Sequence, residues 1–268
     1  ATSETARMII SNTFEGLFQQ MPSGKIENCL AQSYEVSTDQ LTYTFHLRDD
    51  SVWSNGDSVT AYDFEFALRR MFDSAAFSPF ADQVITIRNA QQILSGGANQ
   101  TALGVTAPDR KTLIIRLERP DNLLPEHLAS SYAMPCNQKF FRSTSARYGL
   151  TIENLIFNGP FVVRVWNDGD IISLRRNKTY PNAESVIAGG ANLLIPSLNK
   201  DQISDPIARF LSGETDACKI DYNALPKALD QKGTCASFED TVWVMVLNCE
   251  NPSLANPDIR RALSYTVD

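Results

Sequence analysis

Hydrophobic and polar residues alternate strictly along residues 41–48. Because neighbouring side chains of a strand point to opposite faces of a sheet, a period of two predicts a half-buried β-strand here. The Asn55-Gly56 pair a few residues later predicts a tight turn. The residues expected on the buried face of the strand are Leu41, Tyr43, Phe45 and Leu47.

Helical spacing of apolar residues replaces this alternation in two other places. Residues 4–18 predict a helix that ends near Gly16, before a Pro-Ser-Gly turn. Thr60 and Asp63 form a capping box, with Asp in the place of the usual Glu, and predict the start of a second helix. The apolar residues of that helix, which we expect to be buried, are Phe64, Ala67, Leu68 and Met71.

Shorter elements follow, and the pattern changes again after residue 157. A helix over 90–94 and a strand over 112–117 come first; then Asn167-Asp168-Gly169-Asp170 joins two strands, 161–166 and 171–176, in a hairpin. Strands and helices alternate beyond the hairpin, which favours βαβ units and a largely parallel sheet. The predicted elements are strand 191–195, helix 202–211, strand 216–220, helix 222–230, strands 234–238 and 241–247, and a helix over 257–267 capped by Asn256.

The simplest account of these patterns is an α/β lobe that carries an insertion. Residues 1–23 and 155–245 form the discontinuous lobe, and residues 24–154 form an inserted β-rich α+β subdomain. The length of 268 residues suffices for such a core.

Composition and motifs exclude several functions. The net charge of −7 argues against a nucleic-acid-binding protein, which would carry a basic surface. No stretch approaches the roughly 20 apolar residues that cross a bilayer, and the chain opens on polar sequence without a signal peptide. With two histidines, of which His46 falls on the polar face of its strand, and no catalytic or phosphate-binding motif, we expect neither an enzyme nor a cofactor.

The five cysteines are widely spaced and form no metal-binding pattern, so we expect no metal site. Cys218 and Cys235 flank a predicted helix and could form a disulfide, if neighbouring strands bring them close enough. The alternative is that the cysteines are small buried hydrophobic residues.

Eight short runs carry a more specific signal: TFEGLF at 13–18, LAQSYEV at 30–36, TYTFHLRD at 42–49, WSNGDSVTAYDF at 53–64, NGPF at 158–161, LRRNKTY at 174–180, LSGETD at 211–216 and NPDIRRALSY at 256–265. In this order they resemble the motifs of the bacterial extracellular solute-binding protein family 5, the oligopeptide- and dipeptide-binding proteins of ABC importers. Ser58 replaces the proline that is common in the family. Most of these residues, such as Asn55-Gly56, Thr60 and Gly159-Pro160, are expected to have structural roles.

The resemblance implies a periplasmic-binding-protein-like fold (type II, cluster C), of which this chain holds the first lobe. The second lobe is absent, and residues 246–268 would form the hinge and its beginning. It further implies an extracytoplasmic monomer, in the periplasm or held by a lipid anchor, that captures a peptide by lobe closure. The peptide then passes to the permease of an ABC importer, whose ATPase is a separate partner.

The resemblance also implies which residues line the ligand site. Charged anchors for the peptide carboxylate usually come from the second lobe, which leaves this chain one wall of the cleft. The expected wall consists of Thr2, Ser3, Glu4, Phe80, Phe238, Trp243, Val244 and Val246. Phe80 could instead plug the space between domains, and Glu4 could be a solvated carboxylate rather than a partner of the peptide amine.

Two observations leave the identity of the ligand undecided. Residues 242–246 read Val-Trp-Val-Met-Val, where the family often has tyrosines and an acidic residue, so a more apolar ligand is possible. Alternation also allows only one face of this strand, either Trp243 with Met245 or Val244 with Val246, to reach the ligand. The alternatives are a receptor of the same fold for a metal chelate, heme or sugar, and a peptide-sensing adaptor without transport.

Overall fold

The computed structural model describes residues 3–73, 78–167, 171–194, 205–220 and 256–264. The chain divides into two compact units, residues 1–200 and residues 201–268, and each is described by itself. The three-part division expected from the sequence, with boundaries at 23, 154 and 245, stays a prediction.

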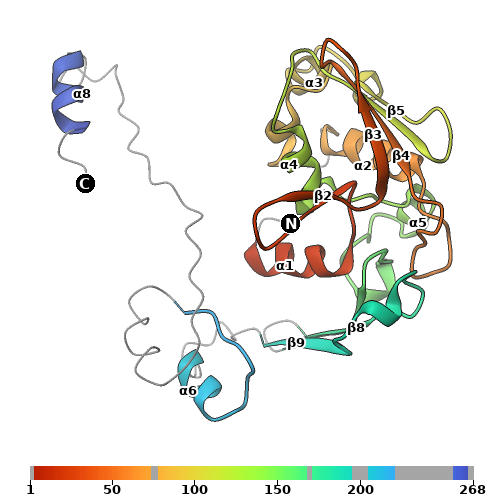
Figure 1. The fold of residues 1–268 in the computed structure, drawn as a ribbon, viewed down its shortest axis with the longest axis vertical. Helices are drawn as coiled ribbons and strands as arrows, with labels where there is room; N and C mark the ends of the chain where they lie inside the picture. The colour runs from red at the N-terminus through yellow and green to blue at the C-terminus, as the bar shows by residue number, and fades with distance from the viewer. Residues whose placement is uncertain (1–2, 74–77, 168–170, 195–204, 221–255, 265–268) are drawn as a thin grey trace. The chain divides into compact units, whose positions relative to one another are not determined.

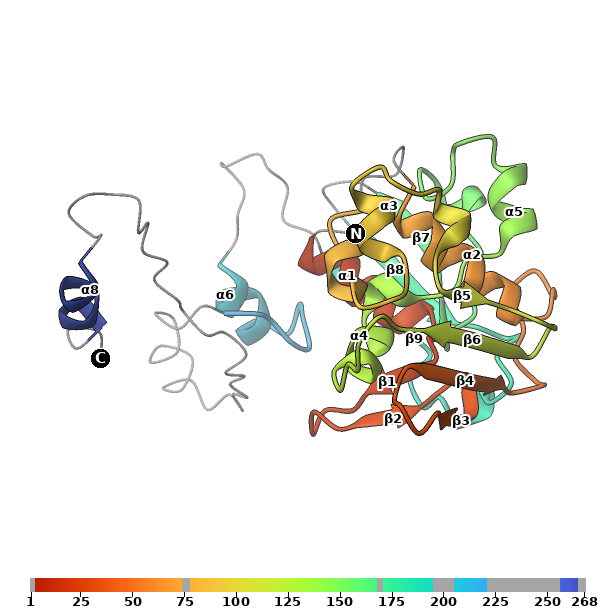
Figure 2. The same cartoon turned by 90° about the horizontal axis from the view of Figure 1, so that it is seen from above.

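The first unit is built around a four-stranded antiparallel sheet with the order β3-β4-β6-β5. Its second strand confirms the predicted alternation, because Tyr43, Phe45 and Leu47 are buried. Helix α2 covers one face of the sheet (Figure 2). The strands are β3 (Ala31–Val36), β4 (Thr42–Leu47), β5 (Val105–Thr106) and β6 (Thr112–Arg116).

Helix α2 (Ala61–Met71) starts at the predicted capping box. One oxygen of the Asp63 carboxylate accepts hydrogen bonds from the Thr60 N–H at 2.9 Å and the Thr60 hydroxyl at 3.1 Å. The same oxygen accepts a bond from Trp53 Nε1 at 3.3 Å. Since Trp53 precedes the Asn55-Gly56 turn, in which Gly56 has φ +90°, this buried carboxylate joins the turn to the helix.

The other helical segments are short. Helix α3 lies where the sequence predicted it, and the remaining segments connect strands around the sheet. They are α3 (Ala90–Leu94), α4 (Leu124–Ala129), α5 (Gln138–Ser143) and the single turns of 3₁₀-helix Ala81–Val84, Gln100–Ala102, Ser131–Ala133, Ile152–Asn154 and Ala183–Ser185.

A three-stranded sheet, β7 (Phe161–Asn167), β8 (Ile171–Arg176) and β9 (Gly190–Leu194), contains the predicted hairpin. Strand β9 pairs with β8 in the antiparallel sense, so the parallel arrangement expected after the hairpin is wrong for this pair. The connection over residues 177–189 contains a single 3₁₀ turn, Ala183–Ser185, and lacks the crossover helix that a parallel pairing usually requires. A two-stranded ribbon, β1 (Phe18–Gln20) with β2 (Ile26–Asn28), is the third sheet of the described residues.

Helix α1 (Glu4–Thr13) ends earlier than the sequence predicted. Phe14 is already extended, and the Thr13 carbonyl accepts a hydrogen bond from the Gly159 N–H at 3.0 Å. The Asn158 side chain accepts a bond from the Glu15 N–H at 3.2 Å and donates one to the Glu15 carbonyl at 3.0 Å. A segment far along the chain therefore satisfies the backbone groups that a longer helix would have used.

This contact gives the first stability prediction. A Cβ atom on Gly159 would lie 2.7 Å from the carbonyl carbon of Thr13 and 2.8 Å from the Phe14 nitrogen, both backbone atoms that cannot rotate away. We expect Gly159→Ala to lower the free energy of unfolding by about 1–3 kcal/mol, the usual cost of overpacking. Urea unfolding followed by circular dichroism measures the change. Gly189→Ala is the matched control, because nothing lies within 4 Å of its added Cβ, and an equal loss in both variants would contradict the prediction.

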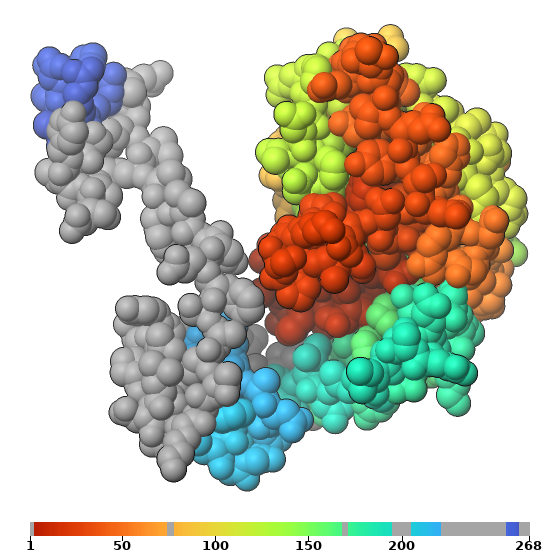
Figure 3. Space-filling model, viewed as in Figure 1, coloured from red at the N-terminus to blue at the C-terminus, as the bar shows by residue number. Residues whose placement is uncertain are grey.

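The apolar interior of the first unit consists of two clusters. The larger lies between the four-stranded sheet and its helices, and the smaller includes Phe157, Val162 and Leu174 against the three-stranded sheet. Phe14, just past α1, packs against both clusters. The N-terminal segment accordingly lies between the two parts of this unit, in red between the teal and the orange to yellow-green atoms (Figures 1 and 3).

The second unit has two described helices, α6 (Pro206–Leu211) and α8 (Pro257–Ser264). Helix α6 ends at Leu211, as the sequence predicted, and Gly213, which has φ +76°, follows shortly after it. The strand predicted over 216–220 is absent, and no described strand lies beside it to supply a ladder. The elements predicted over 222–247 lie outside the described residues.

Candidate ligand-binding pocket

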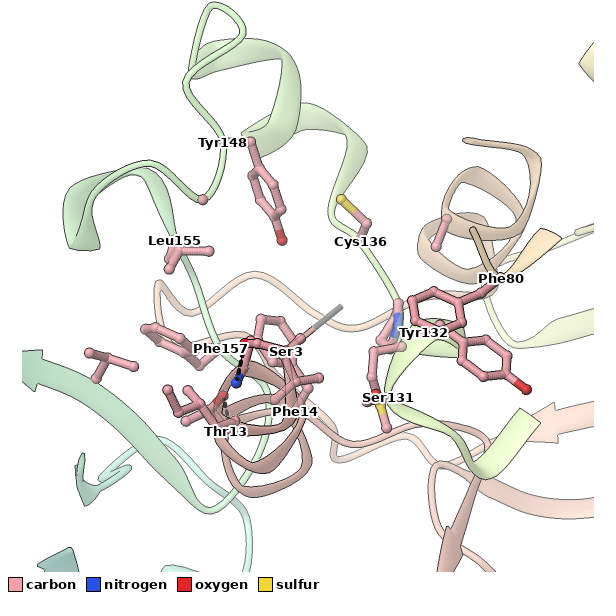
Figure 4. A pocket seen from close by; sticks show the side chains of 18 of the residues that line it. Ser3, Thr13, Phe14, Phe80, Ser131, Tyr132, Cys136, Tyr148, Leu155 and Phe157 are labelled. Atoms are coloured by element: carbon pink, nitrogen blue, oxygen red, sulfur yellow. Dashed lines mark hydrogen bonds between the residues drawn. The ribbon is translucent and has the colours of Figure 1, made fainter. Parts of the chain in front are cut away.

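A pocket of about 810 Å³ opens in the first unit between α1, the end of α2 and the β7–β8 hairpin. Further walls come from the segments 78–80, 131–136 and 148–157 (Figure 4). Its lining is predominantly apolar, and it is large enough for several amino-acid side chains. The residues of the wall belong to segments far apart in the sequence, which the two apolar clusters hold together.

An aromatic pair forms one side of the pocket. The rings of Phe80 and Tyr132 are stacked, with centroids 5.0 Å apart and planes inclined by 11° (Figure 4). His127 Nδ1 lies 3.1 Å from the Tyr132 hydroxyl, and this contact helps to fix the orientation of the ring. Burial raises the pKa of Tyr132 above its ordinary value, so the hydroxyl remains neutral at physiological pH. The pair offers a flat, rigid surface with a polar edge.

Two of the predicted site residues, Ser3 and Phe80, line this same pocket. Ser3 is the N-cap of α1, and its hydroxyl accepts a hydrogen bond from the Ala6 N–H at 3.2 Å. Glu4, the first residue of the helix, is exposed and is not among the described residues that line the pocket. Thr2, Phe238, Trp243, Val244 and Val246 lie outside the described residues, as does Cys235 of the proposed disulfide.

Arg70, Cys136 and Tyr148 lie on another side of the pocket. The guanidinium carbon of Arg70 is 4.3 Å from the ring centroid of Phe141 and 5.9 Å from that of Tyr148. The Tyr148 hydroxyl and the Cys136 thiol lie near each other, and each affects the pKa of the other. Burial raises the pKa of the Cys136 thiol to about 11 and that of the Tyr148 hydroxyl well above its usual range, so both groups are neutral.

Sequence reasoning missed Tyr132 and Arg70 as pocket residues. Tyr132 stands in a proline-punctuated segment that shows no regular period, and Arg70 falls on the polar side of an amphipathic helix. The available signal in the sequence was that Tyr132 lies only five residues after His127. This spacing does not indicate that the ring of Tyr132 stacks on that of Phe80.

Outside the pocket, Glu15 joins two of the sequence motifs. Its carboxylate accepts a 2.5 Å hydrogen bond from the Tyr180 hydroxyl, and the buried Cys29 thiol lies nearby. Burial raises the pKa of Glu15, against the lowering effect of Tyr180 and of the Arg48 charge. The network is polar and partly buried, and it connects residues 13–18 to residues 174–180.

A pH-dependent stability follows from this carboxyl. The pKa of Glu15 is near 4.5 in the unfolded chain and is raised in the folded chain. As the pH rises from the first pKa through the second, ionisation of this buried carboxyl therefore lowers the stability of the fold. Glu15→Gln keeps an acceptor for Tyr180 and removes that cost. We expect the variant to gain stability over the wild type as the pH rises, in urea unfolding from pH 4 to pH 8. Tyr180→Phe should steepen the loss instead, and a pH-independent difference in both variants would contradict the assignment.

Sites of other kinds are absent from the part of the chain that the structure describes. No group of three or more His, Cys, Asp or Glu side chains could hold a metal ion there. Among the same residues, no helix has the length and apolar character needed to cross a membrane.

Comparison with known proteins finds relatives that match nearly the whole chain. The model of the family described as "Bacterial extracellular solute-binding proteins, family 5 Middle" matches residues 25–268. The oligopeptide-binding protein OppA of Bacillus subtilis is 30% identical over 97% of this chain and 48% of its own length. The probable deoxycholate-binding periplasmic protein YgiS of Escherichia coli is 29% identical over 98% of this chain and 49% of its own.

Solved structures agree in fold. Haemophilus influenzae OppA, in complex with the peptide RPPGFSPFR, is 27% identical with a TM-score of 0.76, over 97% of this chain and 51% of that one. The pheromone receptor PrgZ has a TM-score of 0.83 at 26% identity, over 100% of this chain and 53% of that one. The chain therefore spans about half the length of the relatives it matches, and the predicted fold class, one lobe of the periplasmic peptide-binding fold, is confirmed. The chain belongs to the bacterial extracellular solute-binding proteins, family 5.

Proposed function

We propose that this chain forms one wall of a peptide-binding site in an extracytoplasmic receptor of an ABC importer. The observation that carries the proposal is the pocket, in which Ser3 and the stacked pair of Phe80 and Tyr132 meet. Relatives described as an oligopeptide-binding and a dipeptide-binding protein support it. In this proposal the protein acts as a monomer, without a cofactor and without catalysing a reaction.

The pocket suits this task physically. Peptide side chains vary in shape, and a broad recess with aromatic walls binds many of them through apolar contact. Water fills the remaining space and links polar groups at little cost in affinity. Closure of a second lobe would bury the peptide and produce the form that a permease recognises, while ATP is hydrolysed by a separate subunit.

A second candidate is an apolar ligand other than a peptide. The described lining contains no carboxylate that could pair with a peptide amine, and one relative is described as a probable deoxycholate-binding protein. A receptor for a metal chelate, heme or sugar, or a sensing adaptor without transport, would use the same fold.

Native mass spectrometry of the full-length protein, purified from its own host without denaturation, tests the proposal. A ladder of bound masses that fit short peptides is the expected result, and it gives the preferred length. A single bound mass that is not a peptide, or a metal, would contradict peptide binding and favour the second candidate.

A further inference from the structure

The pocket carries one positive charge on an otherwise neutral wall. Among the described residues that line it, Arg70 is the only charged side chain, and neither Asp nor Glu is present. The rest of that wall is hydrocarbon, aromatic ring, thioether, thiol and hydroxyl. A cation in such an apolar recess is costly unless an anion joins it.

Arg70 is held in place without being neutralised. The ring faces of Phe141 and Tyr148, at 4.3 and 5.9 Å, attract the guanidinium but leave its charge uncompensated. Across the described ranges, no carboxylate forms an ion pair with it. Its neighbour Arg69 differs, because that side chain pairs with Glu65 at 2.8 Å. Of these two adjacent arginines, only Arg70 lines the pocket.

The neighbours of Arg70 do not compete for its charge. The Cys136 thiol and the Tyr148 hydroxyl stay neutral at physiological pH, since burial raises the pKa of both. A planar guanidinium presents parallel N–H donors at the spacing of two carboxylate oxygens. An incoming carboxylate would thus meet a preoriented partner.

We propose that Arg70 binds a carboxylate of the ligand, while an apolar part of the same ligand lies against the rings of Phe80 and Tyr132. This inference rests on the proposed function, because it assigns a ligand chemistry to the same pocket. It also adds an anchor for a carboxylate to a lobe in which the sequence had indicated no such anchor. In a peptide the carboxylate can come from the C-terminus or from an acidic side chain.

Three peptides of one apolar sequence separate these possibilities: the free acid, the C-terminal amide, and an amide in which Glu replaces an internal Gln. Isothermal titration calorimetry on the full-length protein measures their affinities. We expect the free acid, the Glu-containing amide or both to bind at least about tenfold more tightly than the neutral amide. Which of the two is preferred identifies the source of the carboxylate.

The variants test whether Arg70 causes that preference. Arg70→Gln should reduce the ratio of affinities to about one, and Arg70→Lys should retain part of it, because the charge remains without the planar fork. Arg142→Gln, which removes an exposed arginine outside the pocket wall, should keep the full ratio. If Arg70 were only a support for Phe141, Arg70→Gln would weaken all three peptides equally, and this outcome would overturn the inference.

The remaining outcomes distinguish the inference from the function on which it rests. Equal binding of all three peptides by the wild type would overturn the role of Arg70 and leave the peptide receptor in place. Failure of the wild type to bind any of the three would count against the peptide receptor itself. Circular dichroism of each variant shows whether its fold is retained.

Discussion

Trp53→Ala is expected to lower the free energy of unfolding by about 3–5 kcal/mol, the range found when a buried aromatic side chain is truncated. Trp53 has 0% of its surface exposed, and its ring contacts that of Phe14 edge-on at 6.3 Å. The substitution removes this volume from the core. It also takes from the buried Asp63 carboxylate one of its hydrogen-bond donors, which adds to the cost.

Urea unfolding followed by circular dichroism at 222 nm measures this change without relying on tryptophan emission. Tyr62→Ala is the control, because Tyr62 is an aromatic residue in the first turn of α2 but is 44% exposed, and its loss should stay within about 0.5 kcal/mol. Trp53→Phe should lie between the two, since it keeps most of the ring and loses the donor. A loss below about 1 kcal/mol for Trp53→Ala would show that this motif does not anchor the core.

Local signals were sufficient where an element is stabilised by its own neighbours. The alternation along 41–48 predicted β4, observed over Thr42–Leu47, because one face of a sheet is buried and the other is not. The capping box at Thr60 and Asp63 predicted the start of α2, since both partners of that contact lie within one turn. The hairpin of β7 and β8 follows from a turn sequence between two apolar strands.

Long-range contacts explain where the predictions failed. Helix α1 stops at Thr13 because Asn158 and Gly159, about half the chain away, bind the backbone that follows it. Strand β9 pairs with β8 in the antiparallel sense. A pattern of alternating strands and helices does not specify the direction of this pairing. Neither partner is visible in the local sequence of the element it controls.

The pocket shows the same limit at the level of function. Ser3 and Phe80 were expected there because of the family resemblance, and the structure brings both to one cavity. Tyr132 and Arg70 join them only because the turn Ser131–Ala133 packs against both α1 and α2. Residues 238–246, predicted for the same wall, lie outside the described residues, so their part in the site stays a prediction.

The central claim is that Phe80 and Tyr132 form a wall of the ligand site rather than a purely structural plug. The most direct test is the affinity of the full-length protein, with both residues replaced by Ala, for a peptide that the wild type binds. Isothermal titration calorimetry should show binding at least about tenfold weaker, because a buried aromatic contact of a ligand is worth 1.4 kcal/mol or more. The far-ultraviolet circular dichroism spectrum should stay that of the wild type. Unchanged affinity in a folded double variant would contradict the assignment of this pocket as the binding site.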